Sequence, residues 1–470
     1  MIKKTDQAEI QSYLEDSSNL QGGYAEGLFL PENEKEIASL LQEANSKKMP
    51  LTVSAGTTGT TGGCIPFGGW ILGTEKLDKI INIDPTKKTA LLQPAVTLEK
   101  LESETKKLGL LYPPDPTEQT AFIGGTLATN ASGARSFRFG ATRNWIKRIK
   151  VTLTSGKTLD IKRGYKIQEY GIKTPNYKMP NTKTSAGYFS TPEMEMIDLF
   201  IGSEGTLGVI TEIEIKLIPN FHDTFDIIVF FLNEETAITF VEKARIETDV
   251  LKLEYFDNKA LNLLRPSYPK LPSHAATAVY METEITESIQ NTYLDKWARL
   301  LENLGADMEK SWLGVTNKQK EELKEFRHSM AEHINEKFKK HHSIKFASDI
   351  AVPDGKLMEM INFYNDKLSA ISHKLFHVKF GHIGQNHLHV NLVPNTPNDI
   401  PLAKEIIADF VRKGVSLGGT CSAEHGIGKI KHDYLKMMYG DKGIEEMIKI
   451  KKTFDPQDIL NRGNIFPANP

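Results

Sequence analysis

The order of apolar and polar residues predicts short helices and strands in the first half of the chain. From Asn33, a suitable N-cap residue, to Ala44, apolar residues recur at helical spacing. The apolar runs 149–154 and 158–161 flank Ser155-Gly156-Lys157, which predicts a β-hairpin. Strands are expected at 51–53, 80–83 and 89–96, and a helix at 98–108.

The pattern changes beyond Pro219, where we place a domain boundary. The segment 164–192 has no sustained period and is expected to be a long loop that covers a site. The charged segment 317–340 predicts a long helix, most of it a solvated face. Further strands are expected at 225–232, 251–256 and 275–281, and further helices at 234–247 and 440–452.

Length and composition narrow the class of protein. A chain of 470 residues exceeds what one core usually supports, so at least two domains are expected. A net charge of -2 lacks the basic excess that nucleic acid requires. Cys64 and Cys421 are too few for a disulfide framework or an iron–sulfur cluster held by this chain alone. With no apolar run of membrane-spanning length, we expect a cytoplasmic protein.

Glycine, serine, threonine and asparagine concentrate in three segments, which we call the first (54–63), second (120–133) and third (201–211) glycine clusters. Glycine lets a ligand approach backbone N–H groups, which suits a pyrophosphate, although each cluster alone also fits a tight turn. None matches the Walker pattern. The one Gly-Lys-Thr sequence in the chain, Gly156-Lys157-Thr158, has Val151 at the position where that pattern needs its first glycine. The spaced glycines of the dinucleotide fingerprint are also missing, so an ordinary Rossmann fold is not supported.

Three motifs resemble the FAD-linked oxidase family with the vanillyl-alcohol-oxidase (PCMH-type) fold. They are Tyr112-Pro113-Pro114-Asp115-Pro116-Thr117, Gly124-Gly125-Thr126-Leu127-Ala128-Thr129-Asn130-Ala131 and Gly202-Ser203-Glu204-Gly205-Thr206-Leu207-Gly208. The resemblance is to the branch of D-lactate dehydrogenases and glycolate-oxidase flavoprotein subunits. It implies an α+β fold with a two-subdomain FAD-binding domain at 1–219 and a cap domain with an antiparallel sheet at 220–430. Residues 431–470 would return to the FAD domain.

The resemblance also implies which residues bind FAD, without a covalent bond. Ser54 and Asn464 depart from the family, which usually has Arg and Lys at these positions. The implied FAD residues are Gly56, Thr57, Thr58, Gly59, Thr60, Pro114, Asp115, Gly124, Gly125, Thr129, Asn130, Ser132, Gly133, Glu204, Gly205, Gly208, Val209, Ile210 and Asn461.

Histidines are concentrated in two C-terminal motifs, 381–391 and 422–426. Imidazoles with a carboxylate suit zinc or manganese, although on a strand such histidines are equally a polar surface. The resemblance implies that His382, His389 and Glu424 bind a divalent metal and that His425 is the catalytic base. The alternative for His425 is a core histidine satisfied by hydrogen bonds. Ala423 stands where the family usually has glycine.

A substrate carboxylate needs a cation, ideally an arginine. Arg327 resembles the family's carboxylate-binding arginine, although it also fits an ordinary helix surface, and Asn391 resembles a further substrate contact. Family members that act on dicarboxylates often have lysine two residues before the position of Asp349, where this chain has Ala347. The nearby Lys345 lies two positions before that place, so a partner for a second carboxylate is doubtful. A small monocarboxylate is therefore favoured.

Together these features predict an FAD-dependent dehydrogenase that oxidises a D-2-hydroxy acid, first of all D-lactate. Its electrons would pass to a quinone, a cytochrome, an electron-transfer flavoprotein or an iron–sulfur partner, which would also allow peripheral membrane association. Alternatives are a glycolate-oxidase-type flavoprotein subunit, a D-2-hydroxyglutarate dehydrogenase, a noncatalytic flavoprotein, and a flavin-free metallohydrolase. A homodimer is compatible with the sequence.

Overall fold

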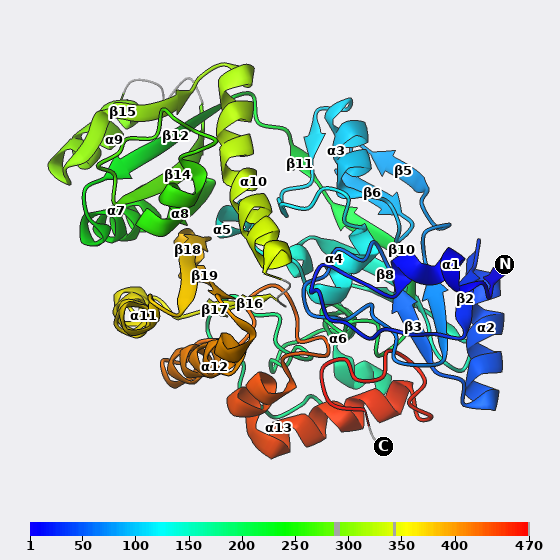
Figure 1. Ribbon diagram of the computed structural model, residues 1–470. Helices are drawn as coiled ribbons and strands as arrows, with labels where there is room; N and C mark the ends of the chain where they lie inside the picture. Colours follow the sequence, from blue (N-terminus) through cyan, green and yellow to red (C-terminus); the bar gives the residue numbers. More distant parts are fainter. Residues whose placement is uncertain (286–291, 342–344, 469–470) are drawn as a thin grey trace. The chain divides into compact units, whose positions relative to one another are not determined.

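The computed structural model describes residues 1–285, 292–341 and 345–468, which form two compact units (Figure 1). The first unit comprises residues 1–132, 141–220 and 421–470. The second comprises residues 133–140 and 221–420. Each unit is described by itself below.

Two segments pack differently from the predicted domains. Residues 421–430, which the sequence placed in the cap, belong to the first unit, where Glu204 accepts hydrogen bonds from the backbone nitrogens of Ile427 (2.7 Å) and Gly428 (2.8 Å). Residues 133–140 belong to the second unit, because Arg135 donates two hydrogen bonds to Glu282, at 2.8 and 2.7 Å. Neither contact is visible in a local sequence pattern.

The first unit begins with a four-stranded sheet in the order β1-β2-β4-β3. Helix α2 (Glu34–Lys47) joins β2 to β3, and Asn33 caps it by accepting a hydrogen bond from the Glu36 nitrogen. This crossover lets β2 and β3 both pair in parallel with β4. The strands are β1 (Ile2–Lys4), β2 (Gly27–Leu30), β3 (Leu51–Ser54) and β4 (Trp70–Gly73).

A second, five-stranded sheet of this unit has the order β5-β6-β10-β8-β9, and its pairs are antiparallel. The predicted hairpin is confirmed: β8 and β9 pair in register, and Gly156 turns between them with φ 79°. The strands are β5 (Ile80–Asp84), β6 (Thr89–Leu92), β8 (Ile146–Thr152), β9 (Thr158–Lys162) and β10 (Val209–Lys216).

The remaining elements of the first unit are mostly short. Helix α13 (His432–Phe454) begins earlier than the predicted 440–452 and is broken at Gly440, whose φ of 65° is not helical. The others are α1 (Gln7–Ile10), η1 (Gln11–Tyr13), α3 (Leu98–Lys106), β7 (Leu110–Leu111), α4 (Ile123–Thr129), η2 (Thr142–Asn144), η3 (Ile167–Tyr170), α6 (Met196–Phe200) and β11 (Ile218–Pro219).

The second unit is built on an antiparallel sheet in the order β15-β12-β14-β13-β18-β19-β16, with β17 paired to β19. Its strands are β12 (Thr224–Phe231), β13 (Lys252–Phe256), β14 (Thr277–Glu284), β15 (Ala306–Gly314), β16 (Phe346–Ala347), β17 (Ile350–Ala351), β18 (Leu375–Gly381) and β19 (His387–Pro394). Its helices are α5 (Ser136–Phe139), α7 (Glu234–Glu247), α8 (Asn258–Leu264), α9 (Thr292–Asn303), α10 (Asn317–Lys340), α11 (Leu357–Ile371) and α12 (Ile400–Ser416), with η4 (Ile383–Gln385) and η5 (Pro397–Asp399).

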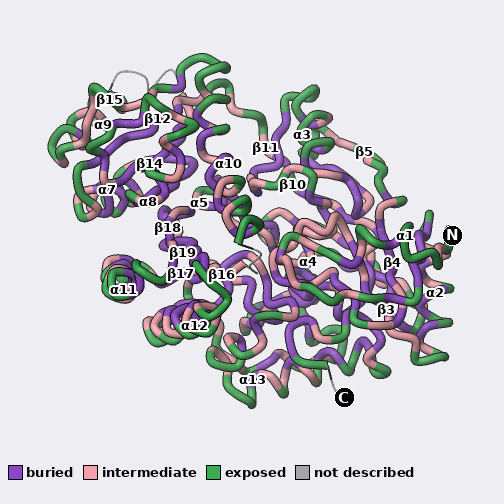
Figure 2. Tube along the Cα trace, viewed as in Figure 1, coloured by how far each residue is buried: buried purple, intermediate pink, exposed green. Residues whose placement is uncertain are grey.

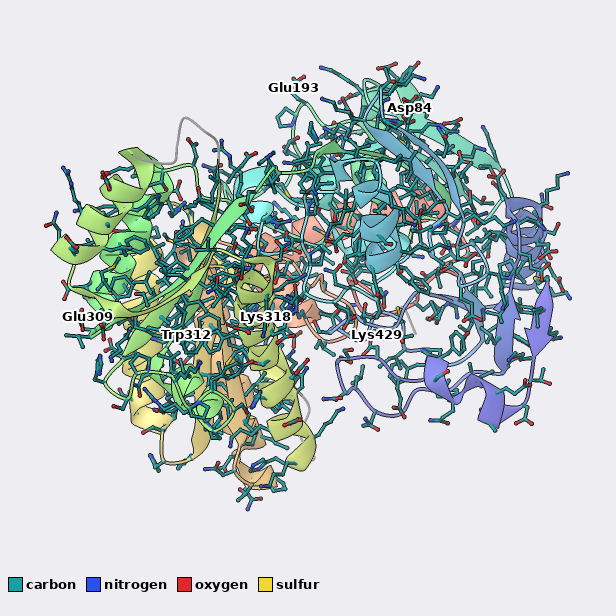
Figure 3. All side chains as sticks on the ribbon, turned by 90° about the horizontal axis from the view of Figure 1, so that it is seen from above. Asp84, Glu193, Glu309, Trp312, Lys318 and Lys429 are labelled. Atoms are coloured by element: carbon teal, nitrogen blue, oxygen red, sulfur yellow. The ribbon has the colours of Figure 1, made fainter. Side chains whose placement is uncertain are left out.

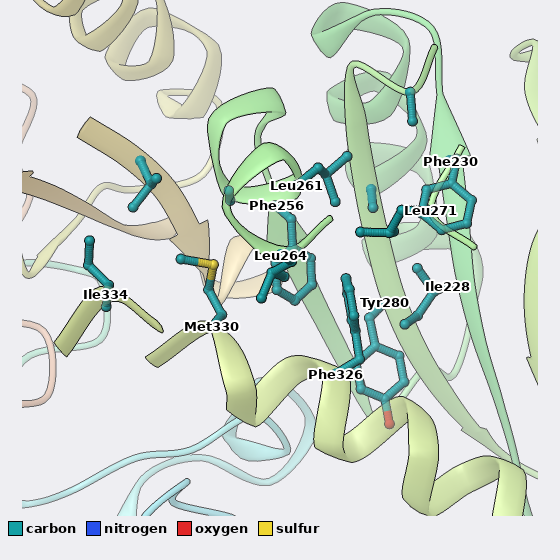
Figure 4. Packing of buried hydrophobic residues seen from close by; sticks show 14 of the residues in the cluster. Ile228, Phe230, Phe256, Leu261, Leu264, Leu271, Tyr280, Phe326, Met330 and Ile334 are labelled. Carbon is teal, nitrogen blue, oxygen red and sulfur yellow. The ribbon is translucent and has the colours of Figure 1, made fainter. Parts of the chain in front are cut away.

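Side chains that alternate along β12 reach two different helix layers, as strand geometry requires. Phe230 belongs to the core beneath α8 and α10, whereas Phe231 packs against Phe240 of α7. Figure 4 shows the first of these cores, in which Phe326 of α10 packs on Phe256 with ring centroids 5.2 Å apart. Apolar burial on both faces therefore fixes the register of the sheet.

Helix α10 has the predicted bounds but not the predicted environment. A stripe of apolar residues along it, including Phe326, Met330 and Ile334, is fully buried, so the helix is a core element with one charged face. Figure 2 shows the same contrast between buried strands and exposed outer faces in both units. Among the described helices, none has the length and apolar composition that crossing a membrane requires.

Candidate active site

The three glycine clusters, far apart in the sequence, meet in the first unit. A Cβ atom added to Gly125 of the second cluster would lie 3.4 Å from the Ala55 Cβ of the first. The Gly202 nitrogen of the third cluster donates a hydrogen bond to the Leu127 carbonyl of the second, at 2.9 Å. The clusters thus form one continuous set of loops rather than three unrelated turns.

Asn461 joins β3, the strand that leads into the first cluster, to the third cluster through its side chain. Its Oδ1 accepts a hydrogen bond from the Val53 nitrogen at 2.7 Å, and its Nδ2 donates to the Glu204 carbonyl at 2.8 Å. A Cβ at Gly205 would lie 2.7 Å from that Nδ2, and Gly205 has φ 72°, so glycine is required there. The structure assigns Asn461 this clamping contact; its predicted contact with FAD stays a prediction.

Lys429 supplies a positive charge next to Asn464, the position at which the family usually has a lysine. The Lys429 Nζ donates a hydrogen bond to Asn464 Oδ1 at 2.6 Å (Lys429 is labelled in Figure 3). Burial lowers the pKa of Lys429 to about 8. Asn464 in turn donates to the Gly63 carbonyl at 3.0 Å. The positive charge therefore remains beside the first cluster, although it comes from a different residue.

The Glu424-His425-Gly426 segment is attached to the same loops. Glu204 binds the two backbone nitrogens that follow it, and Thr61 Oγ1 donates a hydrogen bond to the His425 carbonyl at 3.3 Å. The His425 side chain is 25% exposed to solvent. His425 is therefore not a fully buried core histidine, and its backbone is held at the glycine clusters.

Lys183 contacts Glu424 and was missed by sequence reasoning. Its Nζ lies 2.5 Å from Glu424 Oε2, and the side chains are only 6% and 8% exposed. The Ser185 nitrogen donates to the Ser422 carbonyl at 2.9 Å, so the aperiodic segment 164–192 lies along the segment that carries Glu424. That loop's length without a period was the available signal.

A cluster of three histidines lies in the second unit. His387 and His389 alternate with Leu388 along β19, and their ring centroids are 4.5 Å apart. His382, just before η4, lies 5.5 Å from His387 and 5.7 Å from His389 by the same measure. One potential ligand nitrogen from each lies within 4.8 Å of the others. The strand period thus places His387 and His389 on one face of β19, as the sequence indicated.

Glu254 on β13 connects the histidine cluster to Arg327. Its Oε1 lies 2.6 Å from His382 Nδ1, and its Oε2 accepts hydrogen bonds from Arg327 Nε (3.2 Å) and Nη2 (3.1 Å). Burial alone would raise the pKa of Glu254, but His382 and Arg327 lower it to about 2. Arg327, whose side chain is 12% exposed, is therefore a largely buried ion-pair partner rather than an ordinary helix-surface residue.

The donor chemistry of this cluster fits a zinc or manganese ion. With Nδ1 hydrogen-bonded to a carboxylate, His382 presents Nε2, the arrangement found in metal-binding histidines. His389 Nδ1 has a longer contact, 3.4 Å, with the Ser348 carbonyl. Asn391, also on β19, is 1% exposed, and its Oδ1 has no hydrogen-bond partner in the described part of the chain. An unpaired buried amide oxygen of this kind is suited to a ligand.

The glycine clusters fit the polar groups of FAD. Across the described residues, the backbone N–H groups of residues 56–60 donate to no protein acceptor. A Cβ at Gly59 would meet nothing within 4 Å, and the buried Ser132 Oγ has no protein partner among the same residues. Unpaired donors beside open backbone are what a pyrophosphate requires.

Comparison with known proteins identifies the family. A family model described as FAD linked oxidases, C-terminal domain, matches residues 226–465, and a second, described as FAD binding domain, matches residues 25–162. The chain belongs to the FAD-linked oxidase family. It is 29% identical to D-lactate dehydrogenase of Anaerostipes hadrus, over 92% of this chain and 87% of that one. It is also 29% identical to glycolate oxidase subunit GlcD of Bacillus subtilis, over 94% and 89%.

The fold agrees with that assignment. A structure of 4-ethylphenol oxidase from Gulosibacter chungangensis superimposes with a TM-score of 0.72 over 99% of this chain and 94% of that chain, at 15% identity. The α+β class and the PCMH-type FAD-binding fold predicted from the sequence are thereby confirmed. This FAD-linked oxidase is an oxidoreductase, and its family supports FAD as the cofactor.

The other predicted FAD residues of this FAD-linked oxidase lie in several elements, and their roles stay predictions. Thr129 ends α4 and donates to the Gly125 carbonyl at 3.1 Å, and Asn130 follows it with φ 50°. Gly133 belongs to the second unit. The first cluster contains Gly56, Thr57, Thr58 and Thr60, and the segment between β7 and α4 contains Pro114 and Asp115. Gly124 lies at the start of α4. Gly208 lies in the turn before β10, and Val209 and Ile210 lie on β10.

Glu204 makes the stability of the FAD-linked oxidase depend on pH. Burial raises its pKa from 4.5 to about 7, against the opposing effect of its backbone hydrogen bonds. Because the folded state keeps a proton that the unfolded state has released, stability should fall as pH rises through this window, by about 3 kcal/mol in total. Glu204→Gln should flatten that fall in denaturant titrations at pH 4.5 to 7.5. Equal slopes in the Gln variant, the wild type and the half-buried control Glu214→Gln would refute this.

Proposed function

We propose that this FAD-linked oxidase oxidises a D-2-hydroxy acid, first of all D-lactate, to the 2-oxo acid and passes the electrons to an external acceptor. The observation that carries the proposal is the position of His425. Thr61 holds its backbone carbonyl at the glycine clusters, and Glu204 holds the backbone nitrogen of Ile427 two residues on, while the His425 side chain stays 25% exposed. The names of the two relatives support the substrate class.

His425 is proposed to remove the hydroxyl proton. Histidine takes up and releases protons near neutral pH, which suits a general base. Glu424 Oε1 lies 3.8 Å from His425 Nε2. When bound, FAD supplies the acceptor for the hydride from C2, and a divalent ion supplies positive charge beside the hydroxyl oxygen.

His382 and His389 are proposed to hold that ion, with zinc or manganese as the candidates. Glu254 fixes the ring of His382, and the Ser348 carbonyl contacts that of His389. Glu424 remains the proposed carboxylate ligand on the strength of the family resemblance. It belongs to the first unit, where Lys183 provides its present counter-charge.

Arg327 and Asn391 are proposed to bind the substrate carboxylate and hydroxyl. A guanidinium has five N–H donors in a planar fork, and Glu254 holds that plane through Nε and Nη2. Asn391 contributes its buried amide. Ala347 leaves no lysine for a second carboxylate at that position, which supports a monocarboxylate over 2-hydroxyglutarate.

Arg327→Lys should raise the KM for D-lactate roughly 10-fold to 100-fold with a smaller change in kcat. Lysine keeps a positive charge beside Glu254 but loses the fork, and a charge-assisted hydrogen bond is worth about 1.5–3 kcal/mol. The measurement is steady-state turnover with an artificial electron acceptor, at equal FAD content. An unchanged KM would remove Arg327 from the substrate site.

The substrate ranking tests the proposal as a whole. We expect kcat/KM to be highest for D-lactate among D-lactate, L-lactate, glycolate and D-2-hydroxyglutarate, with the isolated chain active. A higher value for D-2-hydroxyglutarate would favour the dicarboxylate dehydrogenase. Activity that appears only with added partner subunits would favour a glycolate-oxidase-type flavoprotein subunit.

A further inference from the structure

His387 is a third histidine at the cluster, and the ligand set proposed above does not use it. Its side chain is fully buried, and its Nε2 lies 3.0 Å from Asp349 Oδ1, which is also fully buried. Its ring is nearer to His389, at 4.5 Å between centroids, than His382 is. Placing an imidazole and a carboxylate together at zero exposure requires a strong compensating interaction.

We propose that His387 is a third histidine ligand of the metal ion, so that His382, His387 and His389 form a three-imidazole site within the second unit. This inference rests on the proposed function, because it concerns the metal invoked there. The three potential ligand nitrogens already lie within 4.8 Å of one another. A tetrahedral zinc ion, with Zn–N bonds of about 2.0–2.1 Å, separates its nitrogens by about 3.4 Å, so metal binding would draw the three rings closer together.

The backbone supports this arrangement. His387 and His389 are two residues apart on β19, so their side chains emerge on the same face of the strand, while Leu388 points to the other. His387 pairs with Ala351 of β17, and Asp349 lies one residue before that strand. The position of Asp349 is therefore fixed by the strand pairing that also fixes His387.

Asp349 is the matching positioning residue. One of its oxygens lies within 4.8 Å of the potential ligand nitrogen of His389, so its charge offsets that of a divalent cation. Glu254 stands in the same relation to His382, at 2.6 Å from Nδ1. Two of the three histidines thus each face a buried carboxylate, the arrangement that orients metal-binding imidazoles and raises their basicity.

The test counts imidazole ligands directly in the FAD-loaded enzyme with zinc bound, by X-ray absorption spectroscopy at the zinc edge. The wild type should hold one zinc per chain with three imidazoles. His387→Asn should show two imidazoles and a zinc Kd, from competition with a chelator, raised at least about 10-fold. Asp349→Asn should keep three imidazoles with a Kd about 10-fold to 100-fold higher.

His377→Asn is the control, because His377 is a buried histidine on the neighbouring strand β18 that contacts Lys259 instead of the cluster. It should leave both the imidazole count and the Kd unchanged. A wild-type spectrum that shows only two imidazoles would overturn this inference while leaving the proposed function intact. This measurement does not depend on whether any variant folds. Wild-type enzyme that binds no zinc or manganese would overturn the inference together with the metal part of the proposed function.

Discussion

Replacing His425 with alanine is expected to leave FAD bound and to slow anaerobic flavin reduction by D-lactate by about 10²-fold to 10⁴-fold, the usual contribution of a general base. The side chain is partly exposed, and the hydrogen bond from Thr61 goes to the backbone carbonyl, so that bond is kept in the alanine variant. Stopped-flow absorbance at the flavin band measures the rate, and the same spectrum reports FAD content.

His432→Asn is the matched control, because His432 also lies in the first unit but its Nε2 contacts the backbone carbonyls of Gly428 (3.0 Å) and Gly463 (2.7 Å). It should lower stability while leaving the reduction rate within a few-fold of wild type. A His425→Ala enzyme that reduces its flavin at the wild-type rate would show that another group accepts the proton.

Replacing Glu254 with glutamine is expected to weaken both metal binding and stability. Arg327 and His382 share this one buried carboxylate, so the substitution removes a negatively charged partner from both at once. Loss of a carboxylate that orients a metal-binding histidine typically costs 10-fold to 100-fold in metal affinity. Breaking a buried ion pair from one side costs about 3–5 kcal/mol. Metal content after dialysis against a chelator and urea unfolding measure the two effects separately.

Glu282→Gln separates these effects. Glu282 lies on the adjacent strand β14, is 3% exposed and binds Arg135 at 2.7 Å. It contacts no histidine of the cluster in the described structure. It should cost comparable stability while metal affinity stays at the wild-type value. Equal loss of metal in both variants would mean that Glu254 acts only through the stability of the second unit.

Local patterns in the sequence were enough to predict much of the fold. Asn33 caps α2 through its own side chain, and Gly156 allows the positive φ of the β8–β9 hairpin, so each signal acts within a few residues. The bounds of α7 followed from apolar periodicity, and those of α10 from the length of its charged segment. The charges on α10 nevertheless concealed its buried stripe, because a mixed-sign surface dominates the pattern.

The pairs that build the site could not be predicted in this way, because their members are far apart in the sequence. Glu254 and Arg327 are 73 residues apart, and Lys183 and Glu424 are 241 apart. A weak signal did exist on β13, where Lys252 and Glu254 alternate along a strand whose other residues are apolar. Charges on the inner positions of a buried strand indicate partners, but they do not name them.

The parallel pairing of β2, β3 and β4 was also not predicted. These strands are only four residues long, and their partners are set by the crossover through α2 and by burial rather than by turn chemistry. The glycine clusters were recognised as possible ligand loops, but their convergence depends on contacts such as Asn461 with Val53, 408 residues away.

The most direct test of the central claim is an anaerobic absorbance spectrum of the purified, FAD-loaded protein before and after addition of a 2-hydroxy acid. D-lactate, L-lactate, glycolate and D-2-hydroxyglutarate would be added separately, with and without prior removal of metal by a chelator. We expect D-lactate to bleach the flavin band and metal removal to slow that bleaching. A yellow protein whose flavin none of the four acids reduces would contradict the proposed dehydrogenase and favour a noncatalytic flavoprotein.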